Sequence, residues 1–151
     1  MGEEGDAMTP TLIGRWQTRL AMLGVFGGLI SLIFAVSYQP EESGFNEGFF
    51  VVLGFVAGIG LAWDFVFILL QRLRWDRDWP AVFQVLAGIA EGALIWAFLE
   101  GTGLPRIEQG TLPFGIFLGQ YGSIWLVTFI CVQGPMRAVF PRWRFSGGRI
   151  V

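Results

Sequence analysis

The sequence predicts an all-α integral membrane protein. We expect a four-transmembrane-helix antiparallel bundle with both termini in the cytoplasm, short loops and an interfacial C-terminal tail. Hydrophobic residues make up 54% of the 151 residues and charged residues only 15%, whereas a soluble globular chain has about 25% charged residues. The apolar residues also fall into long blocks, which short charged or Gly/Pro-rich breaks separate.

Four of these blocks are long enough to cross a membrane, which takes about 20 mostly apolar residues. The expected spans cover about 20–38, 49–71, 80–99 and 114–132. Because the connections are short, neighbouring helices are expected to run in opposite directions. The domain organisation predicted around them is a mobile acidic N-terminus over 1–12, a transmembrane domain over 13–134 and an Arg/aromatic interfacial tail over 135–151.

Arginine is distributed unevenly among the segments that flank the spans. One group precedes the first span, follows the second or follows the fourth: Arg15, Arg19, Arg72, Arg74, Arg77, Arg137, Arg142, Arg144 and Arg149. The first loop has Glu and no Arg, and the third loop has only Arg106. Since cytoplasmic loops carry the excess of basic residues, this distribution predicts both termini in the cytoplasm, at a bacterial-type cytoplasmic or a thylakoid membrane.

Some of these arginines are expected to bind outside the bundle. Contacts with lipid headgroups or with a partner are predicted for Arg72, Arg74, Arg77, Arg137, Arg142 and Arg144.

The composition excludes several functions. The formal net charge is −2, so there is no basic surface for nucleic acid. The chain has no histidine and one cysteine, Cys131, which argues against a zinc or haem site and excludes an internal disulfide. No nucleophile and base are arranged for catalysis, so we predict neither an enzyme nor a metal site. No cofactor is predicted either, although the spans leave room for a bound lipid, pigment or quinone.

Two acids, Asp64 and Glu91, stand well inside the expected spans. An intramembrane carboxylate costs roughly 2.5–3.5 kcal/mol on insertion scales, so both are expected to face the bundle interior and to have partners there. At about 1.5 Å per residue, Asp64 would lie roughly 10 Å and Glu91 roughly 16 Å from the cytoplasmic end of its span. The remaining offset of about 6 Å is one that long side chains on neighbouring helices could nearly bridge.

The same counting selects polar partners for these acids. Ser31, Gln120 and Tyr121 are expected near the depth of Glu91, and Thr128 near that of Asp64. A polar seam is predicted through Gln71, Gln84, Asp64, Glu91, Ser31, Gln120 and Tyr121. Within it, Glu91 and Gln120 should approach to hydrogen-bond or one-water distance. The acids would fix helix packing, carry a proton or cation, or meet a partner's Arg, a pigment or a quinone.

Each span also carries a G-x-x-x-G pair. The pairs are Gly24/Gly28, Gly54/Gly58, Gly88/Gly92 and Gly115/Gly119. Small residues four apart let helix backbones approach closely in lipid. Packing inside the bundle is the first interpretation, and contact with a helix of another subunit is the second.

Two functions are consistent with these features. The first is a non-catalytic accessory or assembly subunit of a larger respiratory, photosynthetic or secretory membrane complex, which packs through its glycine faces. The alternative is a small homo-oligomeric proton-coupled transporter or ion channel that uses Asp64 and Glu91. The expected partners are therefore membrane lipids and other membrane subunits or further copies of this chain.

Overall fold

The computed structural model describes residues 12–38, 45–73 and 81–135, and in this part of the chain the fold is all-helical. The elements are α1 (Leu12–Met22), a π-helical turn (Leu23–Gly27), α2 (Gly28–Ser37), α3 (Gly48–Leu73), α4 (Ala81–Gly101) and α5 (Phe114–Gln133). Four helices in the described residues are long and apolar enough to cross a membrane: Ile13–Ser37, Gly48–Leu70, Val82–Gly101 and Phe114–Gln133.

The first of these helices begins earlier than the sequence pattern predicts. The expected span starts at Leu20, whereas helix α1 starts at Leu12 and continues through the π-helical turn into α2. Arg15 and Arg19 interrupt the apolar run, so hydropathy alone starts the span after them. In the structure both arginines lie within the helix, and this shift changes the interpretation of the buried acids below.

The π-helical turn keeps the inward faces of α1 and α2 in line. Thr18 and Met22 are buried in α1, and Ser31 and Ala35 in α2, each pair being four residues apart. Gly27, the last residue of the turn, is also buried and lies five residues after Met22. A π-helical turn, with its i→i+5 hydrogen bonds, accommodates one extra residue per turn. The turn therefore places both buried sets against the other helices, whereas a regular α-helix would rotate them apart.

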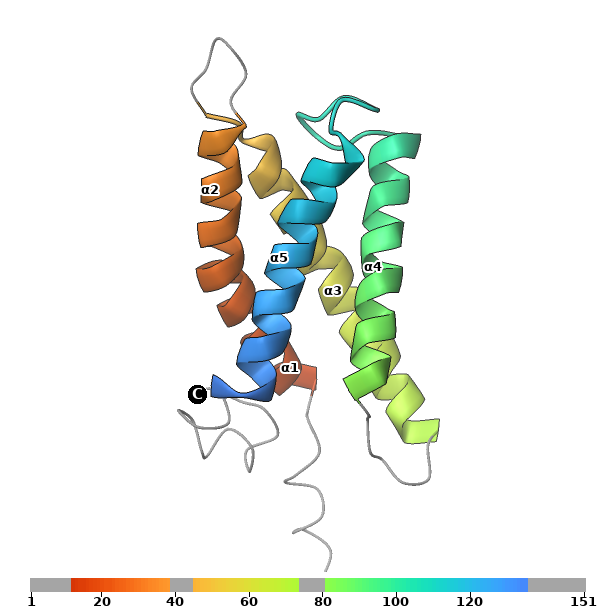
Figure 1. Cartoon of the computed structure of the whole chain (residues 1–151). Helices are drawn as coiled ribbons and strands as arrows, with labels where there is room; N and C mark the ends of the chain where they lie inside the picture. The colour runs from red at the N-terminus through yellow and green to blue at the C-terminus, as the bar shows by residue number, and fades with distance from the viewer. Residues whose placement is uncertain (1–11, 39–44, 74–80, 136–151) are drawn as a thin grey trace, which may run out of the picture.

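Helix α3 lies at the centre of the arrangement. It packs against α1, α2 and α4, and α5 packs against α2, α4 and the π-helical turn. Figure 1 shows that α1, the end of α3, the start of α4 and the end of α5 lie together at one end, which we call the α1 end. The opposite end holds the end of α2, the start of α3 and the connection between α4 and α5.

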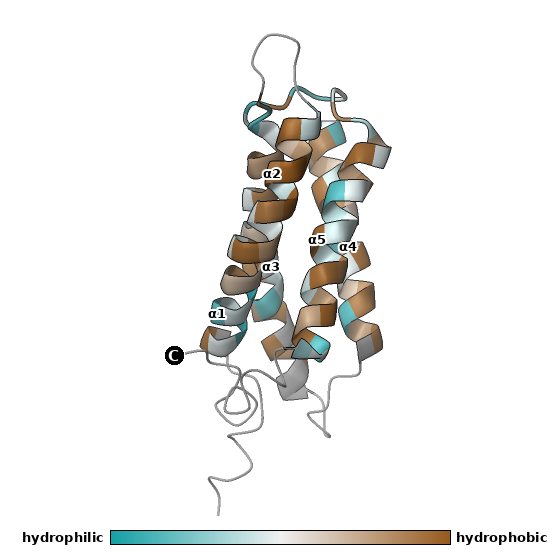
Figure 2. Ribbon diagram, turned by 60° about the vertical axis from the view of Figure 1, so that its left-hand side comes forward, coloured by the Kyte–Doolittle hydropathy of each residue, from teal (hydrophilic) through white to brown (hydrophobic). Residues whose placement is uncertain are grey.

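The interior is a continuous apolar core. Its buried residues are Leu23, Val52, Val56, Ile95, Leu99, Leu104, Phe117, Tyr121 and Ile124. Many large apolar side chains also face outward, including Val25, Leu29 and Ile33 on the first helix and Ile89 on α4. Figure 2 shows this apolar character along most of the helix length. Outward apolar faces of this extent suit helices that are surrounded by lipid.

The connection between α4 and α5 closes the core at the opposite end. Leu104 and Ile107 exchange two backbone hydrogen bonds, at 3.0 and 2.9 Å. Gly103 has φ +70°, and a Cβ at this position would lie 2.8 Å from the carbonyl oxygen of Ile107. Only glycine fits this turn without strain. The turn places Leu104 in the core and packs Ile107 against it.

Candidate functional site

Arg19 is the partner of both buried acids. Its Nε lies 2.9 Å from Oδ2 of Asp64 and its Nη2 lies 3.1 Å from Oδ1, so the guanidinium pairs with this carboxylate through two bonds. Its Nη1 lies 3.5 Å from Oε2 of Glu91. Asp64 is only 3% exposed and Glu91 only 4%. Arg19 therefore links α1, α3 and α4, and we call these three residues the charged cluster.

A glycine makes room for this arginine. A Cβ on Gly60, one turn before Asp64 in α3, would overlap Nη1 of Arg19 and lie 2.9 Å from the guanidinium carbon. With a larger residue here, the Arg19 side chain would have to shift from its position between the carboxylates. Gly60 is thus a structural requirement of the charged cluster, and the i, i+4 spacing of Gly60 and Asp64 on one helix face is the sequence signal for it.

Two further side chains lie close to the charged cluster. Arg15, one turn before Arg19, lies within electrostatic range of Asp64. The Tyr121 hydroxyl from α5 interacts electrostatically with Glu91 and Arg19 and donates a 2.6 Å hydrogen bond to the carbonyl of Gly88. Arg15 and Arg19 together balance the formal charges of Asp64 and Glu91. In Figure 2 the hydrophilic residues of α1 and α3 lie at similar heights, toward the α1 end.

The charged cluster provides the partners that a buried charge requires. An isolated charge is costly in a low-dielectric interior, but a carboxylate that accepts two bonds from one guanidinium recovers much of that cost. Removing one member would leave an uncompensated buried charge. The geometry therefore fits a clamp that fixes the packing of three helices.

A second polar contact, separate from the first, lies toward the opposite end. The amide nitrogen of Gln120 donates to the hydroxyl of Ser31 at 2.9 Å and to the carbonyl oxygen of Phe49 at 2.7 Å. Gln120 and Ser31 are both fully buried. We call Gln120, Ser31 and the Phe49 carbonyl the amide cluster. It joins α5 to α2 and to the start of α3.

The predicted polar seam is thus divided into two clusters. Glu91 and Gln120 were expected at hydrogen-bond or one-water distance. The amide nitrogen of Gln120 instead donates to Ser31 and Phe49 and its Oε1 has no hydrogen-bond partner, so no direct bond to Glu91 forms, and the one-water distance stays a prediction. The depth argument did not include Arg19, because it placed this residue before the span. Two other predicted seam residues lie between α4 and α5. Tyr121 contacts Gly88, and Oε1 of Gln84 accepts a 2.9 Å bond from Gln133.

The four glycine pairs differ in what they face. A Cβ on Gly88 would overlap the Trp125 indole, and one on Gly92 would lie 2.6 Å from Cε1 of Tyr121. This pair therefore packs inside the structure, against side chains of α5. Gly119 also packs inward, since a Cβ there would lie 3.3 Å from the Phe34 ring.

The remaining glycines of these pairs face open space. Among the described residues, a Cβ would meet nothing within 4 Å at Gly24, Gly28, Gly54, Gly58 or Gly115. At these five positions the described residues provide no partner for packing inside the bundle, which was the first interpretation, and contact with a helix of another subunit stays a prediction. Spacing alone could not separate the two cases, because it does not tell which side of a helix faces inward.

Several predicted contacts lie outside the described residues. The segments over 1–11 and 136–151 fall there, and so do the side chains of Gln71, Arg72, Arg74, Arg77, Arg137, Arg142 and Arg144. Within the described residues, no three His, Cys, Asp or Glu side chains gather closely enough to hold a metal ion.

Comparison of this chain with protein-family models, with curated proteins and with solved structures finds no match. The functional argument therefore depends on the two clusters and on the outward faces of the helices.

Proposed function

We propose that this chain is a non-catalytic accessory or assembly subunit of a larger membrane protein complex. The observation that carries the proposal is the pair of open glycine faces, Gly24/Gly28 on the first helix and Gly54/Gly58 on α3. A Cβ at any of these positions would meet no atom of the described residues within 4 Å. In lipid, such faces allow another helix to come close, where dispersion and Cα–H contacts hold it.

The interior supports the same proposal. Arg19 and Arg15 balance the buried acids within the chain, so no partner cation is needed for stability. The described residues provide apolar outward faces and an interior in which aromatic rings pack against one another, rather than a cleft that holds a nucleophile and a base. Such a chain contributes surfaces for assembly.

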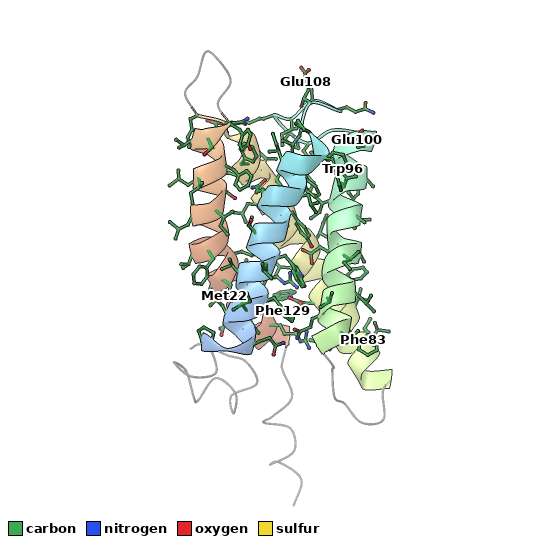
Figure 3. The ribbon with its side chains drawn as sticks, in the orientation of Figure 1. Met22, Phe83, Trp96, Glu100, Glu108 and Phe129 are labelled. Atoms are coloured by element: carbon green, nitrogen blue, oxygen red, sulfur yellow. The ribbon has the colours of Figure 1, made fainter. Side chains whose placement is uncertain are left out.

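The proposed orientation places the α1 end in the cytoplasm, at a bacterial-type cytoplasmic or a thylakoid membrane. Glu100 and Glu108 lie at the opposite end, whereas Phe83 lies near the α1 end (Figure 3). At the opposite end, Glu47 also forms an ion pair with Arg106. Arg72 belongs to the last turn of α3, which ends at the α1 end, and Arg74 and Arg77 follow α3 in the sequence. The positive-inside rule then favours an antiparallel four-helix bundle with both termini in the cytoplasm.

A homo-oligomeric proton-coupled transporter or ion channel is the second candidate. The observation that favours it is Glu91, whose single contact with Arg19 is long, at 3.5 Å. Four helices leave little space for a pore, so this function requires several copies of the chain.

Native mass spectrometry after gentle extraction tests the proposal. We expect foreign chains at fixed stoichiometry with the wild-type protein, and their loss in Gly58→Leu, which fills one open face. Ile89→Phe is the matched control, because it adds volume to an outward position of α4, where the glycine pair packs inward. This variant should keep the partners. A bare homo-oligomer for the wild type would contradict the accessory role and favour the second candidate.

A further inference from the structure

The two buried acids are held very differently by the same arginine. Asp64 receives two short bonds from the Nε and Nη2 side of the guanidinium, at 2.9 and 3.1 Å. Glu91 is reached only by Nη1, at 3.5 Å, within the described contacts. The Arg19–Asp64 pair can therefore persist whether or not Glu91 carries a charge. Protonation of Glu91 would break one long contact and leave the two short ones intact.

The groups that face Glu91 define its electrostatic surroundings. Helix α1 contributes Arg19, α3 contributes Asp64 and α5 contributes Tyr121. Arg15 lies one turn before Arg19 on α1 and interacts electrostatically with Asp64 and Arg19. The cations thus lie on the Asp64 side, and the α5 side presents a neutral phenol whose proton is already donated to the Gly88 carbonyl.

A series of polar side chains on α4 and α5 extends from Glu91 toward the α1 end, alongside the Trp125 indole that packs against Gly88. We call it the α4–α5 track. Gln84 lies on the face of α4 that also carries Gly88 and Glu91, seven residues or about 10 Å before Glu91. Gln84 pairs with Gln133 at 2.9 Å near the helix ends. On α5, Thr128 lies in sequence between Tyr121 and Gln133.

Thr128 gives the independent indication of what occupies this track. Its hydroxyl oxygen is buried and has no hydrogen-bond partner. Oε1 of Gln120, two turns earlier on α5, is also buried and has no hydrogen-bond partner. Buried polar atoms of this kind are normally satisfied by internal water. Thr128 stands seven residues after Tyr121, so water beside its hydroxyl would lie on the face of α5 that carries Tyr121.

We propose that Glu91 exchanges a proton with the aqueous phase at the α1 end, through the α4–α5 track. The carboxylate of Glu91 takes one proton from water and becomes a neutral carboxylic acid, while Arg19 remains paired with Asp64. Release returns the proton by the same route and restores the long contact with Nη1. The proposal does not depend on the identity of partner subunits, so the mass-spectrometric result above leaves it unaffected.

Infrared difference spectroscopy of the full chain in liposomes after a pH jump tests this exchange. We expect a band from a buried carboxylic acid that shifts when glutamate, but not aspartate, is labelled with ¹³C. The band should vanish in Glu91→Gln and persist in Glu100→Gln, whose carboxyl is exposed at the opposite end. If Glu91→Gln does not fold, the ¹³C label in the wild-type protein decides by itself.

The route is tested by the rate at which the same band develops. Thr128→Val removes the hydroxyl at nearly constant volume and should slow the exchange several-fold. Ser31→Ala, in the amide cluster, is the control and should leave the rate unchanged. The proposal is overturned if no buried glutamate titrates over the pH range in which the protein stays folded. Equal rates for Thr128→Val and the wild type would overturn the assigned route.

Discussion

The charged cluster and the amide cluster hold the helices together by different means. The charged cluster joins α1, α3 and α4 through one guanidinium and two carboxylates. The amide cluster joins α5 to α2 and α3 through one neutral side chain. Arg19 and Asp64 need each other, because an unpaired charge is costly to bury. A neutral hydrogen bond can be lost at a much lower cost. Stability should therefore be far more sensitive to substitutions near the α1 end.

The largest effect is expected for Arg19→Leu. This change leaves Asp64 and Glu91 buried without the guanidinium, and breaking a buried ion pair costs about 3–5 kcal/mol. Reversible unfolding in mixed micelles would measure the loss. Leu20→Ala, on the same helix, is a control that shortens an outward apolar side chain and keeps all the charges of the cluster. A loss below about 1 kcal/mol for Arg19→Leu would show that the acids do not depend on this arginine.

An intermediate effect is expected for Gly60→Ala. The added methyl group overlaps the Arg19 guanidinium, and overpacking of this kind costs about 1–3 kcal/mol. Gly58→Ala is a matched control two residues away, where the methyl group meets nothing. That control should be neutral or gain about 0.5–1 kcal/mol, because alanine favours the helix. Equal unfolding free energies for the two variants would contradict the position assigned to Arg19.

The smallest effect is expected in the amide cluster. Gln120→Leu removes two hydrogen bonds, each worth about 0.6 kcal/mol on average between membrane helices. The loss in unfolding free energy should be about 1 kcal/mol, and Ser31→Ala should lose about half of that. A Gln120→Leu effect as large as that of Arg19→Leu would remove the distinction between the two clusters.

The sequence predicted the helical class well because a membrane requires long apolar blocks. The second, third and fourth expected ranges overlap α3, α4 and α5 closely, with starts and ends that differ by at most two residues. Those blocks are bounded by charges or by Pro and Gly, so their limits are plain. The first range was shortened because Arg19 was assigned to the membrane boundary.

The candidate site was predicted only in part for the same reason. Asp64 and Glu91 were expected inside with partners, and both are buried. Their partner was missed, because the cost of burying Arg19 appears prohibitive until its two carboxylates are known. The i, i+4 spacing places Gly60 on the same helix face as Asp64, but the room that Gly60 leaves for Arg19 and the π-helical turn follow from three-dimensional packing.

A double-mutant cycle on Arg19 and Asp64 tests the central claim most directly. Arg19→Leu and Asp64→Leu each leave buried charge without its partner, whereas the double variant removes both groups of the pair. Unfolding free energies would be measured in mixed micelles. The loss in the double variant should be smaller than the sum of the two single losses by about 2 kcal/mol or more. Additive losses, within about 0.5 kcal/mol, would show that the two residues do not interact and would contradict the account.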